Sequence, residues 1–204
     1  MRGMTEREGS AGGGGKKRQG VAKGLHGGVR EVYRDEAIWV LDKPSGVLSH
    51  PNQPGRKASN ALLKGEFDFE DESYRIEVPG GDLHRVWLLH RLDIDTSGLI
   101  VCALDPEAGA IFKQALHDRE VEKTYKALLL SAPRPPIGSW SDCLGRAARG
   151  SRVEVRVRSG RKANAETSYE LERTFAGTGI SLVRLVPHTG RTHQLRVQAA
   201  RHGA

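Results

Sequence analysis

The chain has 204 residues, which is enough for one sizeable domain or for a domain with appendages. It carries 32 Lys and Arg residues against 25 Asp and Glu residues, so its formal net charge is +7. This excess predicts either a polyanionic partner or simply a solvated basic surface. The two cysteines, Cys102 and Cys143, fit no metal or disulfide pattern, and we expect a reducing cytoplasm. No apolar run approaches the roughly 20 residues of a membrane span, and the N-terminus lacks the apolar core of a secretory signal.

Residues 1–28 predict a flexible basic tail. They are rich in Gly, Lys and Arg and too poor in apolar residues to offset the entropy of ordering. The run GGGGKKR, residues 12–18, looks at first like a phosphate-binding loop. Ser10 stands where the first motif glycine belongs, and Lys17 stands where a Ser or Thr should bind magnesium. A linker with nonspecific affinity for RNA is the better interpretation.

Three short apolar runs predict strands in the first half of the folded region, which we expect to begin near Val29. They are residues 38–41, 86–89 and 99–104. Residues 51–82 are polar and rich in turn formers, and they predict no particular element. After the last run, Asp105 is a predicted N-cap, and Pro106 suits the first turn of a helix that continues to about Asp118.

The second half predicts mainly strands. Residues 121–130 form the first of them, and because side chains alternate along a strand, Lys123 and Tyr125 share a face. Turn residues separate the strands that follow, and this hairpin spacing favours antiparallel pairing. These further strands are residues 153–157, 167–173 and 180–186.

A helix is predicted at the end of the chain. Thr189 is a candidate N-cap for residues from about Arg191 to His202. Arg191 then lies at the helix N-terminus, where backbone N–H groups favour anions, and Leu195 follows four residues later on the same face. Strands that arrive in groups, with few helices between them, indicate the α+β class: a mixed, mostly antiparallel central sheet with flanking helices and loops.

The segment HRLDIDTSG, from His90 to Gly98, is the strongest candidate for a functional site. It places Asp93 in a polar loop directly before a buried strand, and catalytic groups favour loops held by a rigid scaffold. Taken alone, the segment favours a structural role, in which Asp93 accepts backbone N–H bonds in the Thr-Ser-Gly turn. Asp93 and Asp95 also leave open a glycoside hydrolase pair, whereas no third acidic or His ligand follows at the spacing of a metal site.

Four segments, in order along the chain, resemble the hallmarks of the RluA-type pseudouridine synthases of the RluA/RsuA superfamily. HRLDIDTSG is similar to the family's HRLD, two variable residues, TSG and an apolar strand. The other segments are VLDKPSGVLSHP (residues 40–51), KTYKA (residues 123–127) and PHTGRTHQLRV (residues 187–197). The resemblance covers about residues 30 to 202. It implies a pseudouridine synthase fold, with a catalytic domain over residues 29–204.

The family isomerises uridine in RNA to pseudouridine. The resemblance therefore implies an RNA partner, ribosomal or transfer RNA, with ribosomal RNA favoured. In this reaction the N1–C1′ glycosidic bond breaks, the uracil turns, and a C5–C1′ bond forms. Because the reaction involves no net redox change and no group donor, the resemblance implies no cofactor and no metal. We expect a monomer without membrane contact.

The resemblance assigns three catalytic residues by position. Asp93 is the catalytic carboxylate, which can attack C1′ or take the C2′ proton, and both routes remain open. Tyr125 matches a tyrosine that stacks on the uracil and assists proton removal at C5. Arg191 matches an arginine that pairs with the catalytic carboxylate, and such a pair lowers the pKa of an Asp and keeps it ionised.

Four further residues are assigned to substrate or RNA binding. Arg91 matches an arginine that helps to occupy the position left by the flipped-out nucleotide, whose extrusion costs a few kcal/mol. Leu195 matches an apolar position that lines the uracil pocket. Lys123 and His90 belong to the motifs, and we assign them to RNA contact or to the scaffold.

The chain departs from the family pattern at both ends. Many members carry a small S4-type RNA-binding domain before the catalytic domain, and residues 1–28 are too short and too polar for one. The family also continues into a Gly-Asp-x-x-Tyr-Gly segment, whereas this chain stops at Ala204, so we expect a truncated or a short member. A non-catalytic RNA-binding protein on the same scaffold is the alternative, although it has no need for Asp93, Tyr125 and Arg191 together.

Overall fold

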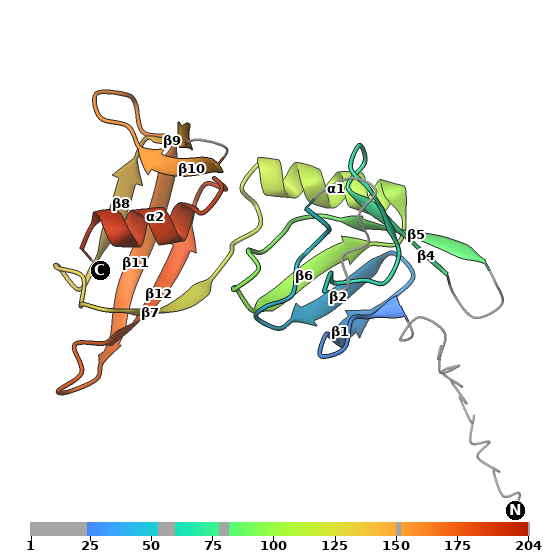
Figure 1. The fold of residues 1–204 in the computed structure, drawn as a ribbon, viewed down its shortest axis with the longest axis horizontal. Coiled ribbons are helices and arrows are strands. Elements are labelled where there is room, and N and C mark those ends of the chain that lie inside the picture. Colours follow the sequence, from blue (N-terminus) through green and yellow to red (C-terminus); the bar gives the residue numbers. More distant parts are fainter. Residues whose placement is uncertain (1–23, 53–59, 78–81, 150–151, 204) are drawn as a thin grey trace, which may run out of the picture. The chain divides into compact units, whose positions relative to one another are not determined.

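The computed structural model describes residues 24–52, 60–77, 82–149 and 152–203 (Figure 1). The chain divides between Gly109 and Ala110 into two compact units. The described residues form twelve strands and two helices, and each unit builds its own sheet. None of the helices in this part of the chain is long and apolar enough to cross a membrane.

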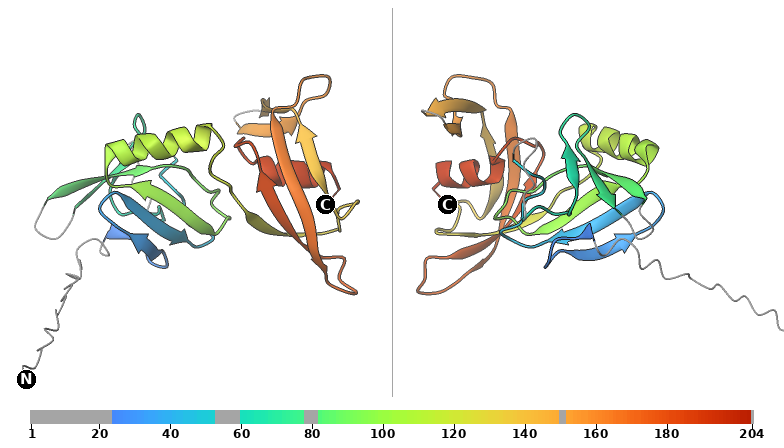
Figure 2. Two further views of the ribbon diagram at one scale, coloured as in Figure 1. Left: turned by 180° about the vertical axis from the view of Figure 1, so that it is seen from behind. Right: turned by 45° about the vertical axis from the view of Figure 1, so that its right-hand side comes forward.

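The first unit is built on a six-stranded antiparallel sheet in the order β1-β2-β6-β5-β4-β3, which Figure 2 shows from two further sides. Helix α1 (Pro106–His117) follows β6. Asp105 caps it, because its Oδ2 accepts a hydrogen bond from Ala108 N at 2.7 Å, as predicted. The strands are β1 (Arg30–Arg34), β2 (Ile38–Lys43), β3 (Glu66–Asp68), β4 (Ser73–Glu77), β5 (Leu83–Leu88) and β6 (Gly98–Ala103).

Strands β2 and β6 are neighbours in the interior of this sheet. In β2, Trp39, Leu41 and Lys43 are buried, whereas the residues between them are half-buried. β6 buries Ile100 and Cys102 in the same core. The strands predicted at these two positions are confirmed.

The polar stretch that predicted no element contains β3 and β4. Tyr74 of β4 is fully buried, and its hydroxyl donates to Ser49 O at 2.8 Å. Phe67 of β3 packs edge-on against Tyr74 and stacks on His50, with ring centroids 4.8 Å apart in both pairs. Contacts between distant segments therefore decide these strands, and the pattern of one short segment does not reveal them.

Part of the predicted tail lies within the described residues. Leu25 forms a β-bridge with Leu63, and His26 N donates to Leu62 O at 3.1 Å. Residues 24–28 therefore belong to the first unit, and its folded part begins earlier than the predicted Val29. The rest of the predicted tail, including the GGGGKKR run, lies outside the described residues.

The second unit combines a four-stranded antiparallel sheet, in the order β7-β12-β11-β8, with a separate two-stranded ribbon of β9 and β10. Helix α2 (Gln194–Arg201) lies across one face of the four-stranded sheet (Figure 1). Leu195 and Ala199 of α2 pack with Trp140, Val183 and Leu185 of the sheet. The strands are β7 (Tyr125–Leu129), β8 (Ile137–Asp142), β9 (Leu144–Arg149), β10 (Arg152–Val157), β11 (Ala165–Thr174) and β12 (Ser181–Pro187).

The predicted α+β class is confirmed, and the paired strands of the described sheets are antiparallel. Strand β7 begins later than predicted, at Tyr125, so that Lys123 lies in the preceding loop. Its pairing partner sets this limit, because the pairing with β12 starts with Tyr125 opposite Leu185. The alternation persists across the boundary, since Lys123 and Tyr125 are half-buried and Thr124 is exposed.

The predicted start of the last helix is wrong. Helix α2 begins at Gln194, so Arg191 precedes the helix and does not occupy its N-terminus. His193 adopts a left-handed backbone conformation with φ 54°, which prevents the helix from extending toward Arg191. Thr189 is not the cap, because its Oγ1 accepts a hydrogen bond from Glu166 N of β11 at 2.9 Å. The expected shared helix face of Arg191 and Leu195 is therefore wrong as well.

A substitution at Gly65 tests the close packing beside β3. A Cβ at this position would overlap the carbonyl oxygen of Arg75 and lie 3.0 Å from Cγ2 of Ile76, so Gly65→Ala forces a backbone shift. We expect the free energy of unfolding to fall by about 1–3 kcal/mol in denaturant titrations. Gly27→Ala is the matched control, because a Cβ there meets nothing within 4 Å. Equal stability of the two variants would contradict the packing described here.

Candidate functional site

A buried ammonium group holds the loop that carries Asp93. Nζ of Lys43 donates to Val47 O at 2.6 Å and to Pro44 O and Ile94 O at 3.1 Å. Gly46 N also donates to Ile94 O, at 2.8 Å. The turn after β2 is thereby tied to the residue that directly follows Asp93.

Ser49 holds the other side of Asp93. Its Oγ donates to Leu92 O at 2.8 Å and accepts from Leu92 N at 3.0 Å, so both backbone groups of that residue are bonded. Thr96 N donates to Asp93 O at 3.0 Å and closes a turn over the segment. The turn that the sequence predicts is present, with the backbone carbonyl of Asp93 as this acceptor. Asp93 itself is half-buried between two fixed neighbours.

His90 and Arg91 have different surroundings. Nε2 of His90 accepts a hydrogen bond from Val101 N of β6 at 3.1 Å, which favours a scaffold role for this residue. Arg91 is exposed, and its Nη1 lies 3.1 Å from Nε2 of His50. Because a guanidinium only donates, this His50 nitrogen accepts, and the other ring nitrogen donates to Pro51 O at 2.7 Å. His50 thus orients Arg91, although sequence analysis did not single it out within VLDKPSGVLSHP.

The positive charge of Lys43 and the negative charges of Asp93 and Asp95 attract each other. Burial lowers the pKa of Lys43 from its ordinary value of 10.5, and the negative charges of Asp95 and Asp93 oppose this by raising it. The net direction is downward, because the loss of hydration outweighs the two carboxylates. Sequence analysis missed Lys43 as a site residue. Its place in the Asp-Lys-Pro-x-Gly segment was the available signal.

Replacement of Lys43 tests this arrangement. Lys43→Met removes the ammonium donor from three carbonyls, of which Ile94 O keeps its bond from Gly46 N, so we expect the free energy of unfolding to fall by about 2–4 kcal/mol near neutral pH. The pKa of Lys43 is lower in the folded chain, so the unfolded chain binds more protons as the pH rises toward 10.5. The difference between parent and variant should therefore widen between about pH 7 and about pH 10 in urea titrations.

Lys64→Met is the control for this experiment, because Lys64 is exposed in the same unit. The free energy of unfolding of Lys64→Met should differ little from that of the parent, and this difference should not widen as the pH rises. If the difference in free energy of unfolding between the parent and Lys43→Met shrinks as the pH rises, the lowered pKa of Lys43 would be contradicted.

In the second unit, Arg191 is exposed but held at two points. Its Nε donates to Asn164 O at 3.1 Å, and its backbone N donates to Oε1 of Gln194 at 3.0 Å. Nζ of Lys123 lies 4.0 Å from the place where a Cβ on Gly190 would be, which brings it to the loop that carries Arg191. Lys123 therefore lies next to the loop that carries Arg191.

Tyr125 and Leu195 border the core of this unit. Both are partly buried and pack against the same cluster of buried residues, which includes Leu129 and Leu185. Tyr125 comes from the first position of β7, and Leu195 comes from the first turn of α2. An aromatic ring and an aliphatic side chain at the border of one apolar cluster can form one wall of a pocket for a planar base.

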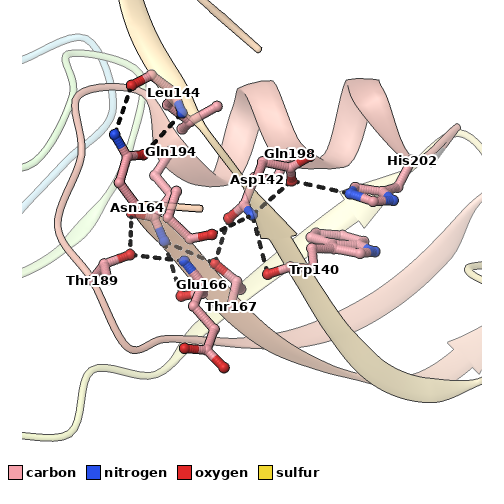
Figure 3. A network of polar contacts seen from close by, with 11 residues as sticks. Trp140, Asp142, Leu144, Asn164, Glu166, Thr167, Thr189, Gln194, Gln198 and His202 are labelled. Carbon is pink, nitrogen blue, oxygen red and sulfur yellow. Dashed lines mark hydrogen bonds and ion pairs between the residues drawn. The ribbon is translucent and has the colours of Figure 1, made fainter. Parts of the chain in front are cut away.

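A buried polar network fixes α2 and the loop before it (Figure 3). Oε1 of Gln194 accepts from Arg191 N and from Oγ1 of Thr189 at 2.8 Å. Its Nε2 donates to Glu166 O at 3.1 Å and to Oγ1 of Thr167 at 3.0 Å. This one side chain therefore joins the Arg191 loop to β11.

The network continues one helical turn later at Gln198, which is fully buried. Its Oε1 accepts from Oγ1 of Thr167 at 2.7 Å, and its Nε2 donates to Oδ2 of Asp142 at 2.9 Å. Nε2 of His202 lies 3.0 Å from the same carboxylate oxygen, and its ring stacks on Trp140. Sequence analysis missed Gln194 and Gln198, although their spacing of four on a predicted helix was the available signal.

Gln198→Leu tests the network. The leucine fills a similar volume but removes one hydrogen-bond partner from each of the buried Asp142 and Thr167, and we expect the free energy of unfolding to fall by about 2–4 kcal/mol. Gln114→Leu is the matched control, since Gln114 is exposed on α1 and bonds only to the exposed Asp118 among the contacts described. Thermal unfolding of both variants measures the effect. A Gln198→Leu variant as stable as Gln114→Leu would contradict a structural role for the network.

The seven candidate residues fall in both units. The first unit carries His90, Arg91 and Asp93, and the second carries Lys123, Tyr125, Arg191 and Leu195. The expected pairing of Arg191 with Asp93 stays a prediction. Within the described residues, no group of three His, Cys, Asp or Glu side chains lies where it could hold a metal ion.

Residues 37–201 match the sequence profile of a family described as RNA pseudouridylate synthase. The chain belongs to the RNA pseudouridylate synthase family. The match contains all seven candidate residues and extends over both units. It confirms the family that the four sequence segments resemble.

Three curated relatives show how far the similarity to other family members extends. An uncharacterized RNA pseudouridine synthase of Bacillus subtilis is 33% identical over 178 residues, which are 87% of this chain and 55% of that protein. The dual-specificity RNA pseudouridine synthase RluA of Haemophilus ducreyi is 31% identical over 84% of this chain and 71% of that protein. The ribosomal large subunit pseudouridine synthase D of Borreliella burgdorferi is 34% identical over 81% of this chain and 49% of its own length. The chain thus spans about half the length of the Bacillus and Borreliella relatives.

Two solved human structures share the fold. Human RNA Pseudouridylate Synthase Domain Containing 1 aligns with a TM-score of 0.62 and 25% identity over 85% of this chain and 64% of that one. Human RNA Pseudouridylate Synthase Domain Containing 4 aligns with a TM-score of 0.57 and 23% identity over 89% of this chain and 65% of that one. These alignments confirm the predicted pseudouridine synthase fold.

Proposed function

We propose that this chain isomerises uridine to pseudouridine in RNA, with Asp93 as the essential carboxylate. The observation that carries the proposal is the anchoring of the Asp93 loop. The side chains of Ser49 and Lys43 bond to the backbone of Leu92 on one side and of Ile94 on the other, so the carboxylate starts from a fixed point. A reacting group held in place loses little entropy when the substrate arrives.

Each candidate residue has its own role in the proposed reaction. The target nucleotide leaves its stack, at a cost of a few kcal/mol, and Arg91 helps to fill the vacated position. Asp93 then attacks C1′ or removes the C2′ proton, and the N1–C1′ bond breaks. After the uracil turns, C5 bonds to C1′ as the Asp93–C1′ bond breaks or, in the second route, as Asp93 returns the proton to C2′. C5 loses its proton with the help of Tyr125, and N1 gains one, so the reaction is a balanced isomerisation.

Arg191 and Leu195 support this step from the second unit. In this proposal Arg191 supplies the positive charge that pairs with the catalytic carboxylate during the reaction. Its backbone is held by Gln194, so the guanidinium starts from a fixed position. Leu195 lines the uracil pocket beside Tyr125, and Lys123 and His90 contact RNA or support the motif loops.

We further propose that the target is a structured RNA in the cytoplasm and that ribosomal RNA is favoured over transfer RNA. In this proposal the protein acts as a monomer. The Borreliella relative is named for the large ribosomal subunit. Mapping of pseudouridines in RNA from cells with and without this gene identifies the target. Loss of a site in transfer RNA alone would contradict the ribosomal assignment.

Asp93→Asn tests the assigned mechanism. The amide neither attacks C1′ nor takes a proton, so we expect pseudouridine formation to fall by at least about a thousand-fold, as for other residues on which the chemical step depends. Binding of the substrate RNA should change by no more than a few-fold, since the amide keeps the shape of the carboxylate. Mass spectrometry of the product RNA and filter binding measure the two effects.

Asp95→Asn is the matched control in the same loop, and it should keep activity because Asp95 is exposed and has no assigned chemical role. Full activity of Asp93→Asn would show that the mechanism assigned here is wrong. RNA binding by the parent chain without any pseudouridine would favour the non-catalytic alternative. Released base or sugar without a new carbon–carbon bond would favour a glycoside hydrolase.

A further inference from the structure

Positive charge is concentrated on one part of the second unit. Strands β9 and β10 and the turn after them, residues 144–149 and 152–162, are called the basic ribbon here. They contain seven Lys and Arg residues and a single acidic residue, Glu154. The ribbon alone has a net charge of six positive, whereas the whole chain has +7, so the rest of the sequence is nearly neutral in sum. The basic residues are Arg146, Arg149, Arg152, Arg156, Arg158, Arg161 and Lys162.

The ribbon has two different faces near its base. Val155 and Val157 are half-buried, whereas Arg156 and Arg158 between and after them are exposed. This alternation is typical of a strand with one face toward the protein and the other toward solvent. Arg156 pairs in register with Gly145 of β9, which has no side chain of its own.

Arg158 is held in place on this exposed face. Its Nη2 donates to Arg146 O at 2.6 Å, and its backbone N donates to Cys143 O at 2.7 Å. The guanidinium lies over Gly145, where a Cβ would overlap Nε of Arg158. The glycine therefore makes room for an arginine laid flat along the ribbon. A guanidinium whose orientation is fixed before binding loses less side-chain entropy when it binds a phosphate.

The turn that follows adds two exposed cations, Arg161 and Lys162. It leads directly to Asn164, whose amide closes the base of the ribbon. Oδ1 of Asn164 accepts from Leu144 N at 2.9 Å, and its Nδ2 donates to Leu144 O at 3.0 Å. The carbonyl of the same residue accepts from Nε of Arg191 at 3.1 Å. The base of the basic ribbon is thus anchored to the residue that holds Arg191.

We propose that the basic ribbon binds the phosphate backbone of the RNA next to the target uridine. This inference rests on the proposed function, because the connection through Asn164 ties the ribbon to Arg191. Exposed arginines match the charge and the bidentate geometry of phosphate oxygens. Contacts of this kind position an RNA without selecting its sequence.

The test compares two double variants of the full chain. Arg156→Gln with Arg158→Gln removes two cations from the ribbon. Arg134→Gln with Arg173→Gln removes two exposed cations from elsewhere in the second unit, with Arg173 at the opposite end of β11 from the ribbon. Thermal unfolding first establishes that both variants are as stable as the parent. Binding of a transfer RNA and ribosomal RNA fragment mixture is then measured from about 0.05 M to about 0.2 M salt.

The ribbon variant should bind more weakly, and the slope of log affinity against log salt should fall by about 1.5, since each lost phosphate contact removes about 0.7 to 0.9. The control variant should keep the slope of the parent. An unchanged ribbon variant, or an equal loss in both variants, would overturn the inference. If the ribbon variant behaves as expected while the parent chain forms no pseudouridine, the proposed function fails and the RNA contact stands. If the parent does not bind RNA, both fail.

Discussion

The buried ammonium group of Lys43 is the interaction on which the geometry of the Asp93 loop depends. A cation taken out of water costs several kcal/mol unless new partners replace its hydration, and here three backbone carbonyls do so. One of them belongs to Ile94, so movement of the loop would take one of the three acceptors away from a buried charge. Ser49 bonds both backbone groups of Leu92 on the other side. The half-buried carboxylate therefore stands between two fixed backbone positions.

In the second unit, buried amide side chains hold the backbone beside the candidate residues. A buried amide offers two donor hydrogens and one acceptor oxygen, and it stabilises a structure only when these are satisfied together. Gln194 and Gln198 meet this condition along one face of α2, and they join β8, β11 and the loop that carries Arg191 (Figure 3). In both units the candidate side chains remain at least partly exposed, while buried polar residues beside them hold the backbone. This division leaves a reactive side chain accessible and still restricts its position.

Local sequence patterns predicted the elements that carry a clear signal in their own residues. The apolar runs of β2 and β6 and the Asp-Pro start of α1 are of this kind. The patterns missed β3 and β4, which are short and polar and owe their place to the buried Tyr74 and the ring of Phe67. They also misplaced the starts of β7 and α2, because a pairing partner limits the first and the left-handed backbone of His193 limits the second.

The sequence by itself determined the family, the seven candidate residues and the concentration of charge between residues 144 and 162, because these depend on which side chains occur and in what order. Only the tertiary structure decided which residues hold the candidates in place. Lys43 lies 51 residues from Ile94, and Gln198 lies 56 residues from Asp142. Hydrogen bonds over such separations depend on strand register and turn geometry, and no local pattern of residues encodes them.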